Sequence, residues 1–209
     1  MALSMWNSWS KSRRGKPVYD QWLDEYLEIM NQEDMILDLG CGNGANTLYL
    51  IERGYQVLSV DYALEALQNV KDFIAESQTL HVDMRQLLPF QNNQFSTVIA
   101  DISLHYLKDE EMKQIMHELR RIIKPQGYLL ARVSSSQDYH GYGLEIESRY
   151  YDFGSYGQRY FVEEDLQKYF SILGYMEYKH TKMMRDEPFY QHPKYLYQIK
   201  VVNTKEREK

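Results

Sequence analysis

The segment ILDLGCGNG at residues 36–44 decides the fold of this 209-residue chain. It belongs to an apolar run at 34–39, which has the composition of a buried strand, and it continues into a glycine-rich turn. Residues 45–53 have the apolar spacing of a helix, and Gly54 suits its C-terminal end. A strand, a glycine turn and a helix in this order form the first unit of an open α/β sheet, in which ligands bind at the carboxyl ends of the strands.

The same alternation continues along the chain on both sides of this unit. We expect strands at 34–39, 56–60, 79–82, 95–100, 128–133, 175–182 and 195–202. We expect helices at 17–31, 45–53, 64–74, 109–123 and 162–173. This spacing predicts an α/β protein with a mostly parallel seven-stranded sheet, covered on both faces, and an antiparallel pair formed by its two C-terminal strands.

Composition narrows the function classes. The chain carries 24 Lys and Arg against 30 Asp and Glu, a net charge of −6, which disfavours nonspecific binding to nucleic acid or acidic membranes. No stretch approaches the roughly 18 apolar residues that a membrane helix needs. The one cysteine, Cys41, excludes an internal disulfide and indicates a reducing compartment. We therefore expect a cytoplasmic protein, monomeric or weakly dimeric, with no nucleic-acid or membrane partner.

Acidic residues follow four of the expected parallel strands: Asp38, Asp61, Asp83 and Asp101. The glycine turn, with Asp61 placed 21 residues after Gly40, also satisfies a relaxed dinucleotide-binding pattern. A rim with four acids would repel a pyrophosphate, however. It favours a ligand with a cationic head, ribose hydroxyls and an aminopurine, and S-adenosylmethionine has all three.

In chain order, these motifs resemble those of class I S-adenosylmethionine-dependent methyltransferases. Residues 36–44 resemble the first motif, 57–61 the ribose-binding strand, 81–84 the adenine-binding stretch, 95–107 the fourth-strand motif, and 120–130 the helix-turn-strand that follows. The similarity covers roughly residues 34–134 and a helix near 161–175. It is nearest to the small-molecule group that includes tellurite-resistance-type and quinone-biosynthesis-type enzymes. It implies a Rossmann-like doubly wound fold, S-adenosylmethionine as cofactor with S-adenosylhomocysteine as product, and a small-molecule acceptor.

The resemblance implies cofactor contacts from Asp38, Gly40, Cys41, Gly42, Asp61, Tyr62, Asp83, Met84, Asp101 and Ile102. Asp38 and Gly40 would hold the methionine end, and Asp61 would accept hydrogen bonds from the ribose. Tyr62 would pack on the adenine, while Asp83 and the Met84 backbone would meet its polar edge. Cys41 suits a small buried filler better than a nucleophile, and Asp101 is either a ligand contact or a structural cap.

The resemblance also divides the chain. Residues 1–16 are expected to form a flexible arm, 17–203 a single methyltransferase domain, and 204–209 a charged tail. Within the domain, 34–134 would be the cofactor half, and the aperiodic Ser-, Tyr- and Gly-rich stretch 135–160 a loop insertion on the substrate side. Trp6, Trp9 and Tyr19 either close over the cofactor as a lid or belong to a disordered arm.

Methyl transfer in line needs alignment, and a general base only when the acceptor carries a proton. On position alone, His105, Tyr106 and Tyr139 are the candidate catalytic residues. Twelve of the 19 tyrosines fall between residues 139 and 197, outside the cofactor half. The candidate substrate-side residues are Tyr19, Arg149, Tyr150 and Arg159.

Two other functions stay open. The chain could be a cofactor-binding regulatory protein without turnover, or, from the glycine pattern alone, an NAD(P)-dependent oxidoreductase. No Cys/His cluster has metal-ligand spacing, so we expect no metal site. Asp101-Ile102-Ser103-Leu104 stands where an Asn-Pro-Pro-Tyr-type tetrapeptide would indicate methylation of a nucleobase or a glutamine amide.

Overall fold

Seven strands form the main sheet of the computed structural model, which describes residues 2–184 and 192–206. Their order is β3-β2-β1-β4-β5-β10-β9. The bounds are β1 Met35–Leu39, β2 Gln56–Asp61, β3 Gln78–His81, β4 Phe95–Asp101, β5 Ile123–Ser134, β9 Gly174–Met183 and β10 Lys194–Asn203. The first five strands pair in parallel, whereas β10 pairs antiparallel with both β5 and β9. The predicted doubly wound sheet with its antiparallel C-terminal pair is confirmed.

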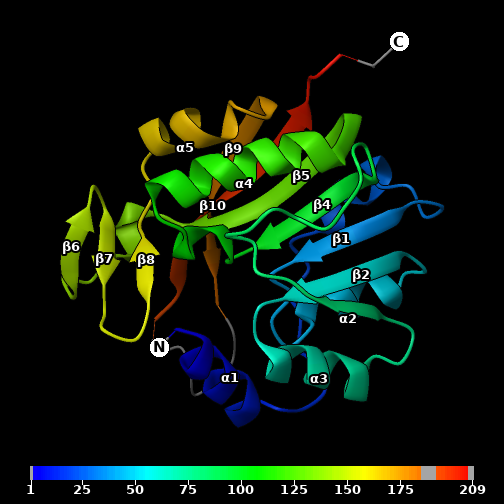
Figure 1. Cartoon of the computed structure of the whole chain (residues 1–209), viewed down its shortest axis with the longest axis horizontal. Helices are drawn as coiled ribbons and strands as arrows, with labels where there is room; N and C mark the ends of the chain where they lie inside the picture. Colours follow the sequence, from blue (N-terminus) through cyan, green and yellow to red (C-terminus); the bar gives the residue numbers. More distant parts are fainter. Residues whose placement is uncertain (1, 185–191, 207–209) are drawn as a thin grey trace.

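Helices cover both faces of this sheet. The α-helices are α1 Ala2–Ser12, α2 Ala45–Ile51, α3 Leu64–Phe73, α4 Asp109–Ile122 and α5 Glu163–Phe170, and short 3₁₀ turns are η1 Asp24–Ile29, η2 Leu104–Tyr106 and η3 Ser136–Asp138. Helices α4 and α5 lie in front of the sheet in Figure 1, and α2 lies behind it. Within the described residues, no helix is long and apolar enough to cross a membrane.

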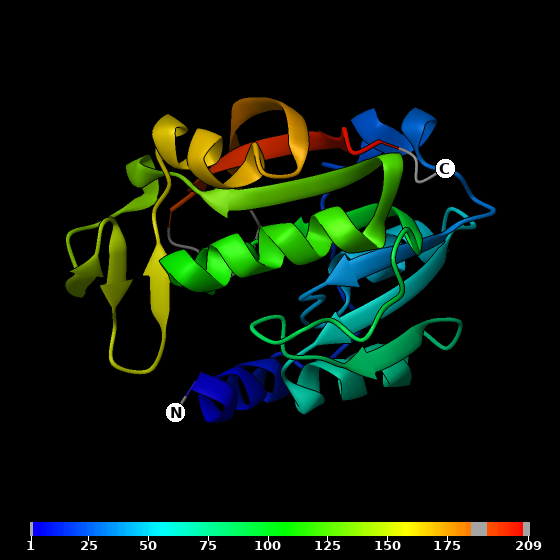
Figure 2. The ribbon, with the colours of Figure 1, turned by 45° about the horizontal axis from the view of Figure 1, so that its top comes forward.

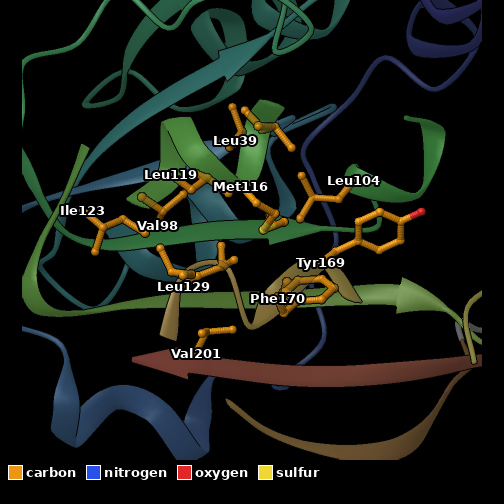
Figure 3. Packing of buried hydrophobic residues seen from close by; sticks show 14 of the residues in the cluster. Leu39, Val98, Leu104, Met116, Leu119, Ile123, Leu129, Tyr169, Phe170 and Val201 are labelled. Carbon is orange, nitrogen blue, oxygen red and sulfur yellow. The ribbon is translucent and has the colours of Figure 1, made fainter. Parts of the chain in front are cut away.

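The core follows from the two-residue period of the strands. Val98 and Leu129 pack with Met116 of α4 in one buried cluster, which Figure 3 shows. Their chain neighbours Ile99 and Leu130 belong to a second cluster on the opposite face. Successive side chains of a strand point to opposite faces, so these central strands bury apolar side chains on both faces of the sheet.

The helix predicted at 17–31 is wrong. Only η1 is helical there, and the residues before it form turns. Of the apolar residues whose spacing suggested a helix, Trp22, Tyr26 and Met30 are buried, whereas Val18 is exposed. Leu23, which that spacing did not include, is also buried in this cluster. A spacing of three to four residues also fits 3₁₀ turns, so packing against the sheet, rather than periodicity, selects the backbone here.

The stretch 135–160 is not the loop that the sequence predicted. Strands β6 Leu144–Glu147, β7 Tyr150–Asp152 and β8 Gly157–Arg159 form a second, antiparallel sheet. Each strand has only three or four residues, too few to show an alternating pattern. The β7–β8 turn contains Gly154, whose φ of +83° an L-residue rarely adopts.

The first residues are helical rather than an unstructured arm. Helix α1 packs on α3, and Asn7 Oδ1 accepts a hydrogen bond from the Glu65 backbone N–H. Figure 2 shows α1 and the β6–β8 sheet on the side to which the carboxyl ends of β1 and β4 point. Of the expected tail at 204–209, residues 207–209 lie outside the described part of the chain, as does Tyr190 of the tyrosine-rich stretch.

Candidate active site

Asp38, near the end of β1, has one carboxylate oxygen without a partner. The Thr47 hydroxyl donates to Oδ2 at 2.7 Å, and within the described residues the buried Oδ1 has no hydrogen-bond partner. Burial, together with the charges of Asp101 and Asp61, raises the pKa of Asp38 to about 7 against the hydrogen bond from Thr47. A cationic ligand group at Oδ1 would supply the missing hydrogen bond and would offset the unfavourable buried negative charge.

Gly40 and Gly42 have different roles in the glycine turn that follows. A Cβ added at Gly40 would lie 2.5 Å from the Cβ of Ser103, so this glycine permits close packing of the segment after β4. A Cβ at Gly42 would meet nothing within 4 Å, although the φ of +53° still favours glycine there. The open space therefore lies over Gly42. Cys41 packs with Leu48 in a buried cluster, as expected of a filler, and burial raises the pKa of its thiol.

Asp61 closes the turn from β2. Its Oδ2 accepts the Gly42 N–H at 2.9 Å and its Oδ1 accepts the Ala63 N–H at 2.7 Å. Burial raises the pKa of Asp61 while these backbone bonds oppose the rise. A carboxylate oxygen has two lone pairs, so both oxygens retain the capacity to accept from ribose hydroxyls.

Arg85 contacts two of the residues that the resemblance assigns to the adenine, Tyr62 and Asp83. Its guanidinium donates to both oxygens of Asp83, at 2.8 and 2.7 Å, and lies over the Tyr62 ring, 4.7 Å from the centroid. Although burial alone would raise the pKa of Asp83, the bonds and charge of Arg85 hold it below its usual value. One face of Tyr62 is thus covered by Arg85, and the Met84 side chain lies against Gly40.

Asp101 is paired with an arginine. It faces Arg132 across the β4–β5 register, and the two form a double hydrogen bond at 2.7 and 2.8 Å. Arg132 also binds Asp20, at 2.8 Å. The four acids lie at the strand ends as predicted, but an unrelieved four-acid rim is wrong, because Arg85 and Arg132 neutralise two of them. Ile102 has a φ of +52°, a strained value for a β-branched residue, and its N–H donates to the Arg132 carbonyl.

Helix α1 is docked beside the glycine turn. The Asn43 side chain donates to the carbonyls of Ser10 and Arg13 at the end of the helix. Trp6 packs against Tyr106, with ring centroids 4.6 Å apart, and against Tyr156 at 6.0 Å. These three rings, here named the aromatic cluster, join α1, η2 and the β7–β8 turn. Of the two interpretations of the N-terminal segment, this geometry favours the lid.

His105 and Tyr150 adjoin the aromatic cluster. His105 is completely buried, its ring centroid lies 4.3 Å from that of Tyr106, and its Nδ1 accepts the Ser134 N–H at 3.3 Å. The Tyr150 hydroxyl donates to the Tyr106 carbonyl at 3.1 Å. The structure thus brings His105, Tyr106 and Tyr150 together. A hollow of about 190 Å³ on the outer side of Tyr150 is lined by residues of the β7–β8 turn, Tyr156 among them.

Two candidate tyrosines lie elsewhere. Tyr139 stacks on Tyr151, with centroids 4.1 Å apart, within the β6–β8 region. Tyr19 donates its hydroxyl to Glu52, just beyond α2, at the end remote from the glycine turn. Neither residue is part of the aromatic cluster.

The two candidate arginines, Arg149 and Arg159, make hydrogen bonds that stabilise the β6–β8 sheet. Arg149 binds Asp165 of α5 through two hydrogen bonds, at 2.8 and 2.6 Å. Arg159 is buried and donates to the Ser148 carbonyl at 2.7 Å, and its guanidinium lies 5.7 Å from the Tyr150 ring centroid. These contacts give both residues structural partners in place of an acceptor.

Sequence reasoning missed two residues of the site. Thr47 orients Asp38, and the signal was a hydroxyl three residues beyond Gly44 in the first turn of a helix. Arg132 neutralises Asp101, and the signal was one charge inside the largely apolar stretch 128–133 of the strand. Among the residues that the structure covers, no group of three or more His, Cys, Asp or Glu is arranged to hold a metal ion.

Comparisons with known proteins agree with this geometry. A family model described as a methyltransferase domain matches residues 37–131. The putative methyltransferase YqeM of Bacillus subtilis is 34% identical over 122 residues, which are 56% of this chain and 49% of that protein. The chain spans about half the length of the first curated relatives that it matches.

Solved structures show the same fold. A SAM-dependent methyltransferase from Methanosarcina mazei superposes with a TM-score of 0.72 at 18% identity, over 90% of this chain and all of that one. The 1,6-didemethyltoxoflavin-N1-methyltransferase of Burkholderia thailandensis, solved with 1,6-didemethyltoxoflavin and S-adenosylhomocysteine, has a TM-score of 0.60 at 17% identity, over 98% of this chain and 79% of that one. The motifs, the match to the methyltransferase-domain model and the shared fold together confirm the predicted resemblance to the class I superfamily of S-adenosylmethionine-dependent methyltransferases.

Proposed function

We propose that this protein transfers the methyl group of S-adenosylmethionine to a small-molecule acceptor. Two observations carry the proposal: Asp38 Oδ1 is buried without a partner among the described residues, and the glycine turn that follows Asp38 has open space over Gly42. The cofactor supplies a methyl group made electrophilic by a sulfonium, and it carries an ammonium and a ribose diol. Asp38 would bind the ammonium, and Asp61 would accept from the diol.

The charges of the rim support this cofactor over a dinucleotide. Within the described residues, Asp38 and Asp61 form no ion pair, so the β1–β2 end has two carboxyls without a cationic partner. Arg85 and Arg132, the cations of this rim, are each held by a carboxylate. A pyrophosphate at the glycine turn would meet the two acids without a free cation from either arginine, which disfavours the oxidoreductase alternative.

The aromatic cluster supports the proposal that the methyl acceptor is a small molecule. Trp6, Tyr106 and Tyr156 present flat apolar rings with few freely rotating bonds, which suits a small planar compound. The neighbour from Burkholderia thailandensis was solved with 1,6-didemethyltoxoflavin, a small molecule of that kind. These residues would align the acceptor with the methyl carbon and sulfur and would exclude water. We also propose a cytoplasmic location and a monomeric or weakly dimeric state.

A methyl-transfer screen tests the proposal. The full chain would be incubated with S-adenosylmethionine labelled in its methyl group and with separate pools of phenols, carboxylates, thiols, amines and nucleosides. We expect label in at least one small-molecule pool and none with the Asp61→Ala variant. Cofactor binding without transfer to any pool would favour the regulatory alternative, and label confined to nucleosides or macromolecules would contradict the acceptor class.

A further inference from the structure

The hydrogen bonds of His105 fix where its ring carries a proton. The Ser134 backbone N–H donates to Nδ1, so Nδ1 must present a lone pair. In a neutral imidazole the proton then resides on Nε2. Burial, with the nearby charge of Lys194, lowers the pKa of His105 well below 6.5, so the ring stays neutral at physiological pH.

The Nε2–H donor has no partner. His105 is completely buried, and within the described residues Nε2 lacks any hydrogen-bond partner. Buried donors in folded proteins are almost always satisfied, so an unsatisfied one calls for an explanation, such as a role in the reaction or a missing partner. The chemical group missing here is an acceptor atom, because Nε2–H is a donor.

The position of His105 points to the methyl acceptor as the source of that atom. Ser103, two residues earlier, donates its hydroxyl to the Leu39 carbonyl at 2.9 Å and lies against Gly40 of the cofactor turn. Tyr106, the next residue, belongs to the aromatic cluster. Along the chain, His105 therefore lies between a residue that contacts the glycine turn and a residue of the aromatic cluster.

We propose that the Nε2–H of His105 donates a hydrogen bond to an oxygen of the methyl acceptor, and that this acceptor is a flat aromatic compound carrying a carbonyl or oxyanion. The proposal rests on the proposed function and adds the class of acceptor. A bond to the reacting lone pair would compete with methylation, so the bonded oxygen is a neighbour of the methylated atom. His105 orients the acceptor.

This role excludes His105 as the general base that its position alone suggested. Its Nε2 already carries a proton, and its Nδ1 lone pair is taken by Ser134. During transfer the lone pair of the acceptor atom forms the bond to the methyl carbon, and the electrons of the carbon–sulfur bond leave with sulfur. No proton passes to His105, so the acceptor must arrive with an available lone pair.

Two substitutions separate the functions of the two ring nitrogens. The amide of His105→Gln places N–H donors near the position of Nε2 but cannot act as a base. The shorter His105→Asn keeps an oxygen able to accept the Ser134 N–H, while its own donor falls short of the Nε2 position. The probe is salicylate, a flat fluorescent aromatic anion with two adjacent oxygens.

Salicylate affinity would be measured on the full chain saturated with S-adenosylhomocysteine. We expect wild type and His105→Gln to agree within about threefold and His105→Asn to bind at least about tenfold more weakly, with equal S-adenosylhomocysteine affinity in all three. Equal salicylate binding by His105→Asn, or none by wild type, would overturn the inference. Failure of wild type to bind S-adenosylhomocysteine would instead contradict the proposed function.

Nuclear magnetic resonance of the ¹⁵N-histidine-labelled wild type gives a second test that needs no variant to fold. We expect His105 to keep the Nε2–H tautomer from pH 5.5 to 8 without titrating, and we expect its Nε2–H resonance to move when salicylate is added. A proton on Nδ1, or titration near the ordinary histidine value, would overturn the inference.

Discussion

Lowering the pH from 7.5 to 6 should weaken the binding of S-adenosylhomocysteine, and Asp38 is the group responsible. The pKa of this carboxyl is about 7 in the ligand-free protein, because burial and the charges of Asp101 and Asp61 favour its protonated form. A ligand ammonium at the unpartnered Oδ1 needs the carboxylate. Binding must therefore displace a proton, and its cost rises as the pH falls through 7.

The size of the effect follows from the fraction of Asp38 that is ionised. With a pKa of about 7, roughly three quarters of the carboxyls are ionised at pH 7.5 and roughly one tenth at pH 6. The apparent dissociation constant varies inversely with the competent fraction, so it should rise by about eightfold over this range. Calorimetric titration of the full chain, repeated in buffers of different ionisation enthalpy, measures both the affinity and the proton released.

Two variants assign the effect to Asp38. Asp38→Asn mimics the protonated carboxyl and still accepts the Thr47 hydroxyl, so we expect weak binding that does not change with pH. His81→Gln removes a histidine whose ring stacks against Tyr62, and we expect this variant to keep the wild-type pH dependence. A pH-independent wild type, or a slope that survives in Asp38→Asn, would refute this reasoning.

Three further predictions test other parts of the site. Arg132→Met should lower the free energy of unfolding, measured by denaturant titration, by about 3–5 kcal/mol, because it leaves Asp101 buried without its cation. Adding Asp101→Asn should recover part of this loss. Full stability of the single variant would refute the pairing. Gly42→Ala and Gly154→Ala should each lower the free energy of unfolding by about 1 kcal/mol, because both glycines have a positive φ. Only Gly42→Ala should weaken S-adenosylhomocysteine binding, by at least about tenfold, because it fills the space over the glycine turn. Equal affinities of the two variants would place the ligand elsewhere. Trp6→Ala should speed the dissociation of S-adenosylhomocysteine in stopped-flow traces by about two- to tenfold, since it removes the ring contacts of α1; an unchanged rate would contradict the lid.

The main sheet was predictable because its signals are local. Four of the parallel strands contain an apolar run next to a turn or an acid, whereas the edge strand β3 is mostly polar. The segment 17–31 failed because 3₁₀ turns and an α-helix share the same apolar spacing, and contacts such as that of Leu23 with the sheet decide between them. The β6–β8 sheet escaped prediction because its strands have three or four residues and are defined only by pairing.

The sequence predicted the positions of single residues of the site, but it did not predict which residues form ion pairs or hydrogen bonds with one another. The positions of Asp38, Asp61 and Gly42 follow from the glycine motif and the strand ends. The neutralisation of Asp101 depends on the β4–β5 register that places Arg132 opposite it, and no sequence pattern gives that register. The tautomer of His105 depends likewise on a backbone N–H contributed by another strand, 29 residues further along the chain.

Calorimetric titration of the full chain with S-adenosylhomocysteine at pH 7.5, alone and in the presence of excess NAD, tests the central claim most directly. The arrangement of Asp38, Gly42 and Asp61 predicts saturable binding of one ligand per chain with a submillimolar dissociation constant, unaffected by NAD. The absence of binding at submillimolar ligand, or displacement of the ligand by NAD, would contradict it.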